Sequence, residues 1–323
     1  MKPLAAWMAA ALAMVFAGPE KLAAAEPESE LAELQQRDAQ LFAIGWRLAR
    51  ANAPFCRETV PALGILLHDA AAYDDPEAVR AAHGLTGDIG VQAVAPDSPA
   101  DRAGLPLDAT LVSVNGVVTA DWPRGAPSWE RLTLLQDAID SALMPGAPAS
   151  VGWIAPDGAR RDVAIPAVPV CRSRFEVLTS GQRALAEGSR VIFGRDFPGF
   201  GYPEDEFAAA IAHELAHNLL GHRATLDAAG RGRSLIRLTE READRLMPWL
   251  LQNAGYDPGA AVRFMERWGP RHGGGLLRKR THDGWDERVE FIAAELGEIE
   301  RVLTQGGTAA DWSRHFRRES LAD

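Results

Sequence analysis

Two histidines and a glutamate form an HExxH pattern, with His213, Glu214 and His217 at its defining positions. On a helix, residues four apart lie on one face, so both imidazoles could bind one Zn²⁺. Glu214 could then act on a metal-bound water as general base. The preceding apolar residues 207–212 predict a buried helix, where unpaired charge is costly. The pattern therefore favours a metal site over an accidental pair of histidines.

A catalytic zinc site needs a third protein ligand. The longer pattern HExxHxxGxxH is excluded, because Leu220 and Arg223 stand where it requires Gly and His. Downstream, Glu240 and Asp244 share one face of a predicted helix, whereas Glu242 points elsewhere. Glu240 is the expected third ligand, and Asp244 would accept the outer N–H of a zinc-bound imidazole. The alternative is an ordinary charged helix start.

The order HExxH then ExxxD resembles the gluzincin zinc metallopeptidases of the HtpX, BepA and CAAX-prenyl-protease type, peptidase family forty-eight. The NAGYDP segment at 253–258 is similar to the AGYDP of that family. Residues 281–288 are similar to its H-P-x-x-x-x-R segment, with Asp283 where proline is usual. The resemblance covers roughly residues 175–305 and implies a zincin-type fold, mainly helical with a small sheet.

The same resemblance implies a role for each matching residue. The ligands of one Zn²⁺ per chain would be His213, His217 and Glu240. Glu214 would be the catalytic base, and Asp244 would support a ligand. His282 and Arg288 become candidates for stabilising the transition state or for occluding the metal; otherwise His282 belongs to an exposed basic loop and Arg288 to a helix surface. His222, at a helix end, is interpreted as structural.

The N-terminus predicts export. A basic start, an apolar stretch over 4–16 and an A-x-A site indicate a signal peptide over 1–25, since the stretch is short for a membrane anchor. No later segment approaches the ~18 uninterrupted apolar residues of a membrane helix. We therefore expect a soluble periplasmic or secreted chain without a transmembrane anchor. In such a chain Cys56 and Cys171 predict a disulfide, with two free thiols as the alternative.

Residues 59–171 resemble the PDZ domains of bacterial envelope proteases. They contain SPA-x-x-AGL at 98–105, a strand ending in an Asn-Gly turn at 115–116 and a final hairpin. Segment 84–87 or 88–91 is the candidate carboxylate-binding loop. Such a domain would bind C-terminal or extended peptides by strand addition. The alternative is a degenerate domain that packs on the protease and regulates access.

The whole chain is predicted to be α+β, with the zincin-type part joined to a β-rich PDZ-like domain. The predicted order is a signal peptide (1–25), an N-terminal helix packing on the protease domain (26–58), the PDZ-like domain (59–171) and a zinc metallopeptidase domain (172–323). Helices are expected over 28–53, 128–143, 258–268 and about 285–304. Residues 189–194 are expected to form an edge strand that binds substrate, and 269–275 a flexible lid. The C-terminus is expected to be mobile.

The formal net charge of −10 argues against nucleic acid and anionic membranes as partners. Together, these features predict a zinc-dependent endopeptidase of the cell envelope that acts on protein or peptide substrates, in a role such as protein quality control. The alternative is a PDZ-type peptide-binding or chaperone-like envelope protein whose zinc site is inactive or occluded.

Overall fold

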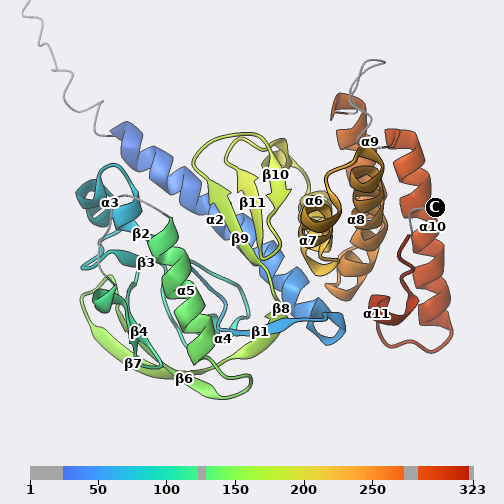
Figure 1. Ribbon diagram of the computed structural model, residues 1–323. Helices are drawn as coiled ribbons and strands as arrows, with labels where there is room; N and C mark the ends of the chain where they lie inside the picture. The colour runs from blue at the N-terminus through green and yellow to red at the C-terminus, as the bar shows by residue number, and fades with distance from the viewer. Residues whose placement is uncertain (1–24, 123–128, 273–282, 320–323) are drawn as a thin grey trace, which may run out of the picture.

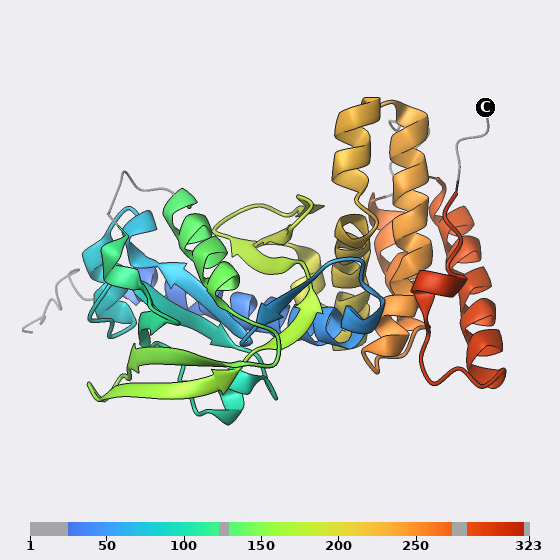
Figure 2. The ribbon, with the colours of Figure 1, turned by 60° about the horizontal axis from the view of Figure 1, so that its bottom comes forward.

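The computed structural model describes residues 25–122, 129–272 and 283–319, so the predicted signal peptide, apart from its last residue, and His282 lie outside the described residues. The protein is α+β, as predicted, with separate sheets and a group of long helices (Figures 1 and 2). The helices are α2 (Ala25–Asn52), α3 (Pro76–Ala82), α4 (Pro99–Arg102), α5 (Glu130–Ala142), α6 (Glu204–Leu219), α7 (His222–Ala229), α8 (Arg233–Asn253), α9 (Ala260–His272), α10 (Trp285–Thr304) and α11 (Trp312–His315). The strands are β1 (Thr59–Ala62), β2 (Ile65–Asp69), β3 (Ile89–Val94), β4 (Thr110–Val114), β5 (Val117–Val118), β6 (Pro148–Ile154), β7 (Arg160–Pro166), β8 (Val168–Cys171), β9 (Arg174–Leu178), β10 (Ala184–Ala186) and β11 (Arg190–Gly194).

The long helix α2 connects the two halves of the molecule. Its apolar stripe, including Leu41, Ile44 and Leu48, is buried, which is why the sequence predicts a helix here. The helix contacts β3 in one half and β8, β9, α6 and α8 in the other. In Figure 1 it runs as a blue diagonal from the six-stranded sheet toward the helical group. It therefore packs on both halves and not on the helical half alone.

A six-stranded antiparallel sheet forms the first half, with the order β2-β3-β4-β6-β7 and β5 paired to β4. Its apolar residues make a separate core between Leu63 and Ala167. Helix α5 contributes Leu135 and Ile139 to that core. A second buried cluster joins α2, the small sheet and the C-terminal helices. The described part of the chain thus has two hydrophobic cores.

The small sheet has the order β10-β11-β9, in which β11 pairs parallel with β9 and antiparallel with β10. The prediction that 189–194 forms an edge strand is wrong, because β11 is the central strand and its residues 191–194 are buried. The edge beside the C-terminal helices is β10, a strand of three residues. So short a strand leaves no alternating pattern for sequence analysis to detect.

Helix α9 is longer than predicted. It continues to His272, so residues 269–272 are helical and not part of a flexible loop. Gly269 fits because its backbone lies against Trp285, where a Cβ would come within 2.4 Å of that side chain. The rings of Trp268 and His272 stack at 3.5 Å along the last turn. The rest of the predicted lid, 273–275, lies outside the described residues.

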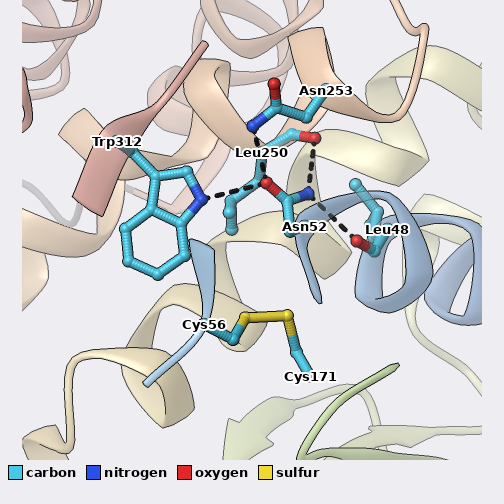
Figure 3. The surroundings of a disulfide bond; sticks show 7 residues. All are labelled: Leu48, Asn52, Cys56, Cys171, Leu250, Asn253 and Trp312. Carbon is cyan, nitrogen blue, oxygen red and sulfur yellow. Dashed lines mark hydrogen bonds between the residues drawn. A yellow bond between two sulfur atoms is a disulfide. The ribbon is translucent and has the colours of Figure 1, made fainter. Parts of the chain in front are cut away.

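A disulfide joins Cys56 to Cys171, which confirms the predicted pairing. It links the segment after α2 to the end of β8 and so closes the base of the 59–171 segment (Figure 3). Close by, the buried side chain of Asn52 donates to the carbonyls of Leu48 and Leu250. Its Oδ1 accepts from Asn253 and Trp312. Asn52 therefore connects α2, α8 and α11 through one side chain.

The C-terminal segment 316–319 is held against α8, so the predicted mobility of the C-terminus is wrong for these residues, while 320–323 lie outside the described residues. Glu319 accepts hydrogen bonds from Arg241 and Arg245 of that helix, and Arg318 bonds to Glu242. The polar composition that suggested mobility instead satisfies buried charge on α8. Across the described ranges, every helix is too short or too polar to span a lipid bilayer.

Candidate metal centre

Helix α6 presents the HExxH motif from a buried apolar segment. Acidic residues 204–206 fill its first turn, where they complement the helix dipole. Residues 207–212 are buried and hold the helix against the core. The helix ends just before Gly221, whose φ of 68° suits glycine. His213 and His217, one turn apart, meet α8 across the packed α6–α8 contact.

The ligand atoms of His213, His217 and Glu240 lie together as predicted. The two Nε2 atoms are 3.3 Å apart, and the Glu240 oxygens lie 3.5 Å and 3.6 Å from them. A tetrahedral zinc ion with bonds of about 2.0–2.1 Å places its ligands about 3.3–3.4 Å apart. Among the described residues, this is the group of His, Cys, Asp and Glu that could hold a metal ion. The spacing and the donor types fit Zn²⁺ with one open position.

Asp244 lies behind His213, as predicted for a residue that supports a ligand. Its Oδ1 lies 3.0 Å from His213 Nδ1, so the carboxylate directly faces the buried outer nitrogen of this imidazole. Arg288 donates two hydrogen bonds, of 2.6 Å and 2.7 Å, to the Asp244 carboxylate. This pairing offsets the cost of burying both charges.

The two histidines differ in their electrostatic environment. Burial lowers the pKa of His213, but the Asp244 and Glu240 carboxylates outweigh it and raise that pKa to about 10. Burial also acts on His217, where it prevails and lowers the pKa to about 3. In the metal-free protein one imidazole thus carries a proton that a metal ion would displace.

His222 and Glu242 belong to this centre, although sequence analysis assigned neither of them to it. The Nδ1 atoms of His222 and His217 are 2.9 Å apart, and His222 Nε2 is 3.1 Å from Glu242 Oε2. Burial raises the pKa of Glu242, but the bonds from His222 and Arg318 outweigh it and lower it to about 2. The sequence offers one signal for this contact. His222 follows His217 by five residues and comes just after Gly221, where the chain changes direction.

Of the other predicted residues, Arg288 lines the same cleft as the three ligand residues, with its guanidinium on Asp244. His282 lies outside the described residues. Its neighbour Asp283, which stands where the resembled family has proline, accepts a 2.9 Å hydrogen bond from Arg241. This ion pair gives the unusual residue a structural role, because it attaches the start of the α10 segment to α8.

A cleft of about 690 Å³ opens beside the ligand atoms, and Glu214 lines it. Its lining includes β10; at the two ends of this strand, the Arg183 carbonyl accepts from the Gly194 N–H of β11 and the Glu187 N–H donates to the Arg190 carbonyl. Because such bonds alternate along an antiparallel pair, Ala184 and Ala186 direct their N–H and C=O groups toward the cleft. Phe197, Phe264 and Trp268 form an apolar part of the wall.

A second, smaller cavity of about 110 Å³ lies between β2 and α5. Its lining includes Leu63, Gly64 and Ile139, and also Phe42 and Trp46 of α2. Segments 84–87 and 88–91, the predicted carboxylate-binding loops, are not part of that lining. The segment that leads into β2 lines the cavity instead, because β2 is the strand beside α5.

No protein-family model matches this chain, and comparisons with curated proteins and with solved structures find no significant match.

Proposed function

We propose that this protein is an exported zinc-dependent endopeptidase of the gluzincin type. The observation that carries the proposal is the convergence of His213, His217 and Glu240, whose ligand atoms lie within 4.8 Å of one another, with Glu214 lining the same cleft. Bound there, Zn²⁺ would supply a Lewis acid that activates water and polarises the scissile carbonyl. The disulfide supports export, since such bonds persist in oxidising compartments.

The proposed mechanism assigns each step to a residue of this chain. Glu214 accepts the proton of the attacking water and passes it to the leaving amine nitrogen. Asp244, held by Arg288, keeps His213 oriented as a ligand. The outward backbone groups of β10 bind an extended substrate as an added strand. An open strand edge beside the cleft favours a polypeptide substrate over a small molecule.

The Glu214→Gln variant tests this function. We expect it to retain zinc, because Glu214 is not among the three ligand residues. We expect cleavage of casein to fall about 10²–10⁴-fold, the usual contribution of a general base. Metal content and casein cleavage, with and without a chelator, are measured on the same samples. Exposed Glu266 of α9 gives the matched control Glu266→Gln, and full activity of Glu214→Gln would contradict the mechanism.

A second candidate is a peptide-binding or chaperone-like protein that uses its PDZ-like half. The cavity between β2 and α5 favours it, because among the described strands β2 pairs only with β3 and leaves its other edge toward α5. Against it, side chains of α2 share the lining and leave only about 110 Å³. Bound zinc with no cleavage of casein under any condition would favour this candidate.

A further inference from the structure

A buried chain of side chains runs from His217 away from the metal site to the C-terminal segment 316–319. We propose that His222 is a positioning residue that fixes the ring of His217, and that Arg318 completes the metal centre through Glu242. This inference rests on the proposed zinc site. It adds His222, Glu242 and the C-terminal segment 316–319, which contains Arg318, to that site.

The contacts select one tautomer for each ring. If His217 Nε2 faces the metal, its Nδ1 must carry the hydrogen. His222 Nδ1, at 2.9 Å, must then accept that hydrogen. The proton of His222 therefore lies on Nε2, where it is donated to Glu242. His222 and Glu242 are 1% and 0% exposed, so water does not compete for these bonds.

Arg318 compensates the buried charge at the end of this chain. Its Nη2 donates a 2.7 Å hydrogen bond to Glu242, and the backbone N–H of Glu319 donates another of 2.8 Å. Its Nη1 donates to the carbonyl of Leu220, at the end of α6. The arginine therefore joins the helix that carries HExxH to the carboxylate that orients His222. Without it, Glu242 would be a buried charge bonded only to His222 and the Glu319 backbone.

The two histidine ligands are thus supported differently. His213 contacts the carboxylate of Asp244 directly, and Arg288 compensates that carboxylate. On the side away from the metal site, His217 Nδ1 is linked to the Glu242 carboxylate through the imidazole of His222, and the compensating arginine belongs to the C-terminal segment. The orientation of His217 consequently depends on whether that segment is in place. Docking of 316–319 is expected to control zinc affinity.

Paired substitutions at His222 in the full-length protein test the first step. In His222→Asn, the amide takes the place of Nδ1 and can still accept from His217. In His222→Gln, the amide takes the place of Nε2 and meets only Glu242. We expect His222→Gln to lower Zn²⁺ affinity about 10–100-fold, the usual cost of losing such a partner, and His222→Asn to retain most of it. The visible absorption of the Co²⁺-substituted protein should change in His222→Gln and stay close to wild type in His222→Asn.

Arg318→Ala tests the second step, with Arg314→Ala as its control. Arg314 belongs to the adjoining helix α11, its side chain is 81% exposed, and it pairs with Asp311. We expect Arg318→Ala to weaken Zn²⁺ binding and alter the Co²⁺ spectrum, and Arg314→Ala to change neither. Titration against a chromophoric chelator gives the affinities.

Four outcomes separate this inference from the proposed function. Equal Zn²⁺ affinity and spectra in the wild type, His222→Gln and Arg318→Ala would overturn the inference and leave the zinc site intact. Equal losses in His222→Asn and His222→Gln would also overturn it, since they would indicate a merely structural role. A wild-type protein that binds no Zn²⁺ overturns both. If it binds Zn²⁺ without cleaving casein, the endopeptidase proposal fails and the affinities still decide the inference.

Discussion

The guanidinium of Arg288 is occupied in a way that changes its expected role. The family resemblance of the sequence made it a candidate to stabilise the transition state, but two of its nitrogens bond to Asp244. With Asp244 against His213, the arginine is better placed to hold a ligand than to contact a substrate. For the proposed zinc enzyme, this contact predicts that Arg288 controls zinc affinity and not turnover.

Replacing Arg288 with lysine separates the two roles. Lysine keeps the charge but cannot make the paired hydrogen bonds of a guanidinium. We expect Zn²⁺ affinity to fall roughly 10-fold, toward the low end for supporting residues, and kcat at saturating zinc to stay near wild type. Unchanged zinc affinity with a reduced kcat would instead indicate contact with the transition state. Arg263→Lys, in an exposed ion pair of α9, is the control.

Local spacing is enough to predict which residues meet at the candidate metal site and that Asp244 lies behind His213, but not which residues lie behind His217. His213, His217 and Glu240 follow from one-turn and ligand arguments along two helices. Glu242 lies on another face of its helix, so it does not group with Glu240 by periodicity. Its partner Arg318 is 76 residues away. Such contacts depend on how the C-terminal segment packs, which no local pattern encodes.

At the scale of elements, the position of β10 decides how a substrate could bind. The backbone N–H of Ala186 points away from β11, toward the cleft. The hydrogen bonds that pair this edge with β11 are made by neighbouring residues such as Glu187. Proline removes an N–H and is tolerated on an edge strand. A change at this position therefore alters the outer edge of the sheet and leaves the inner pairing in place.

We expect Ala186→Pro to raise the KM for a peptide substrate several-fold, since one net hydrogen bond contributes about 0.5–1.5 kcal/mol, with zinc content unchanged. Steady-state kinetics on a fluorogenic peptide measure the effect. Ala186→Val keeps the N–H and should behave like the wild type. An unaltered KM in Ala186→Pro would show that substrate does not pair with this edge.

Element boundaries also show where sequence patterns fail. Glycine and proline at 269–270 predict a loop, yet α9 continues because Gly269 packs closely on Trp285 and Trp268 stacks on His272. Tertiary contacts override the local preference at this position. By contrast, α2, α5 and α10 match their predicted ranges closely, since long amphipathic patterns define them without help from distant residues.

At the scale of the whole molecule, Asp38 of α2 lies at the junction of the two halves. It accepts hydrogen bonds from Gln92 of β3 and the Val177 N–H of β9. Burial raises its pKa from 3.8 to about 7. The folded protein therefore binds the Asp38 proton more tightly than the unfolded chain does. Protonation of Asp38 stabilises the fold fully below pH ~4, and this stabilisation is lost as pH rises through about 7.

Asp38→Asn should remove this pH dependence. At pH 4 the variant and the wild type should unfold with similar free energies. The variant should then gain up to about 4 kcal/mol over the wild type by pH 8, taking about 1.4 kcal/mol per pKa unit. Urea unfolding at several pH values measures the difference. A constant difference from pH 4 to pH 8 would contradict the raised pKa.

Asn52 makes a second prediction at this scale. Asn52→Ala leaves the buried Trp312 N–H and the Leu250 carbonyl without their partner. Each such loss costs about 1–3 kcal/mol, so we expect a clearly lower midpoint of thermal unfolding. The exposed Gln36 of the same helix supplies the control Gln36→Ala, which should change stability by less than about 0.5 kcal/mol. Equal midpoints would show that Asn52 does not join the helices energetically.

The two-part organisation is predictable from motifs, but the joint between the parts is not. Trp312 and Asn52 are 260 residues apart, and Asp38 reaches two different sheets. Neither contact leaves a trace in periodicity or composition. Sequence analysis therefore places α2 on one half alone, whereas it packs on both.

The order of residues along the chain, with Arg318 far downstream of His217, sets an order of events during synthesis. The HExxH helix is made about a hundred residues before the arginine that compensates Glu242, and α2 is made long before its partner Trp312. A growing chain thus contains all three ligands while His217 still lacks its full support. At the proposed zinc site, the metal should be held firmly only after Arg318 has been made and segment 316–319 has packed against α8.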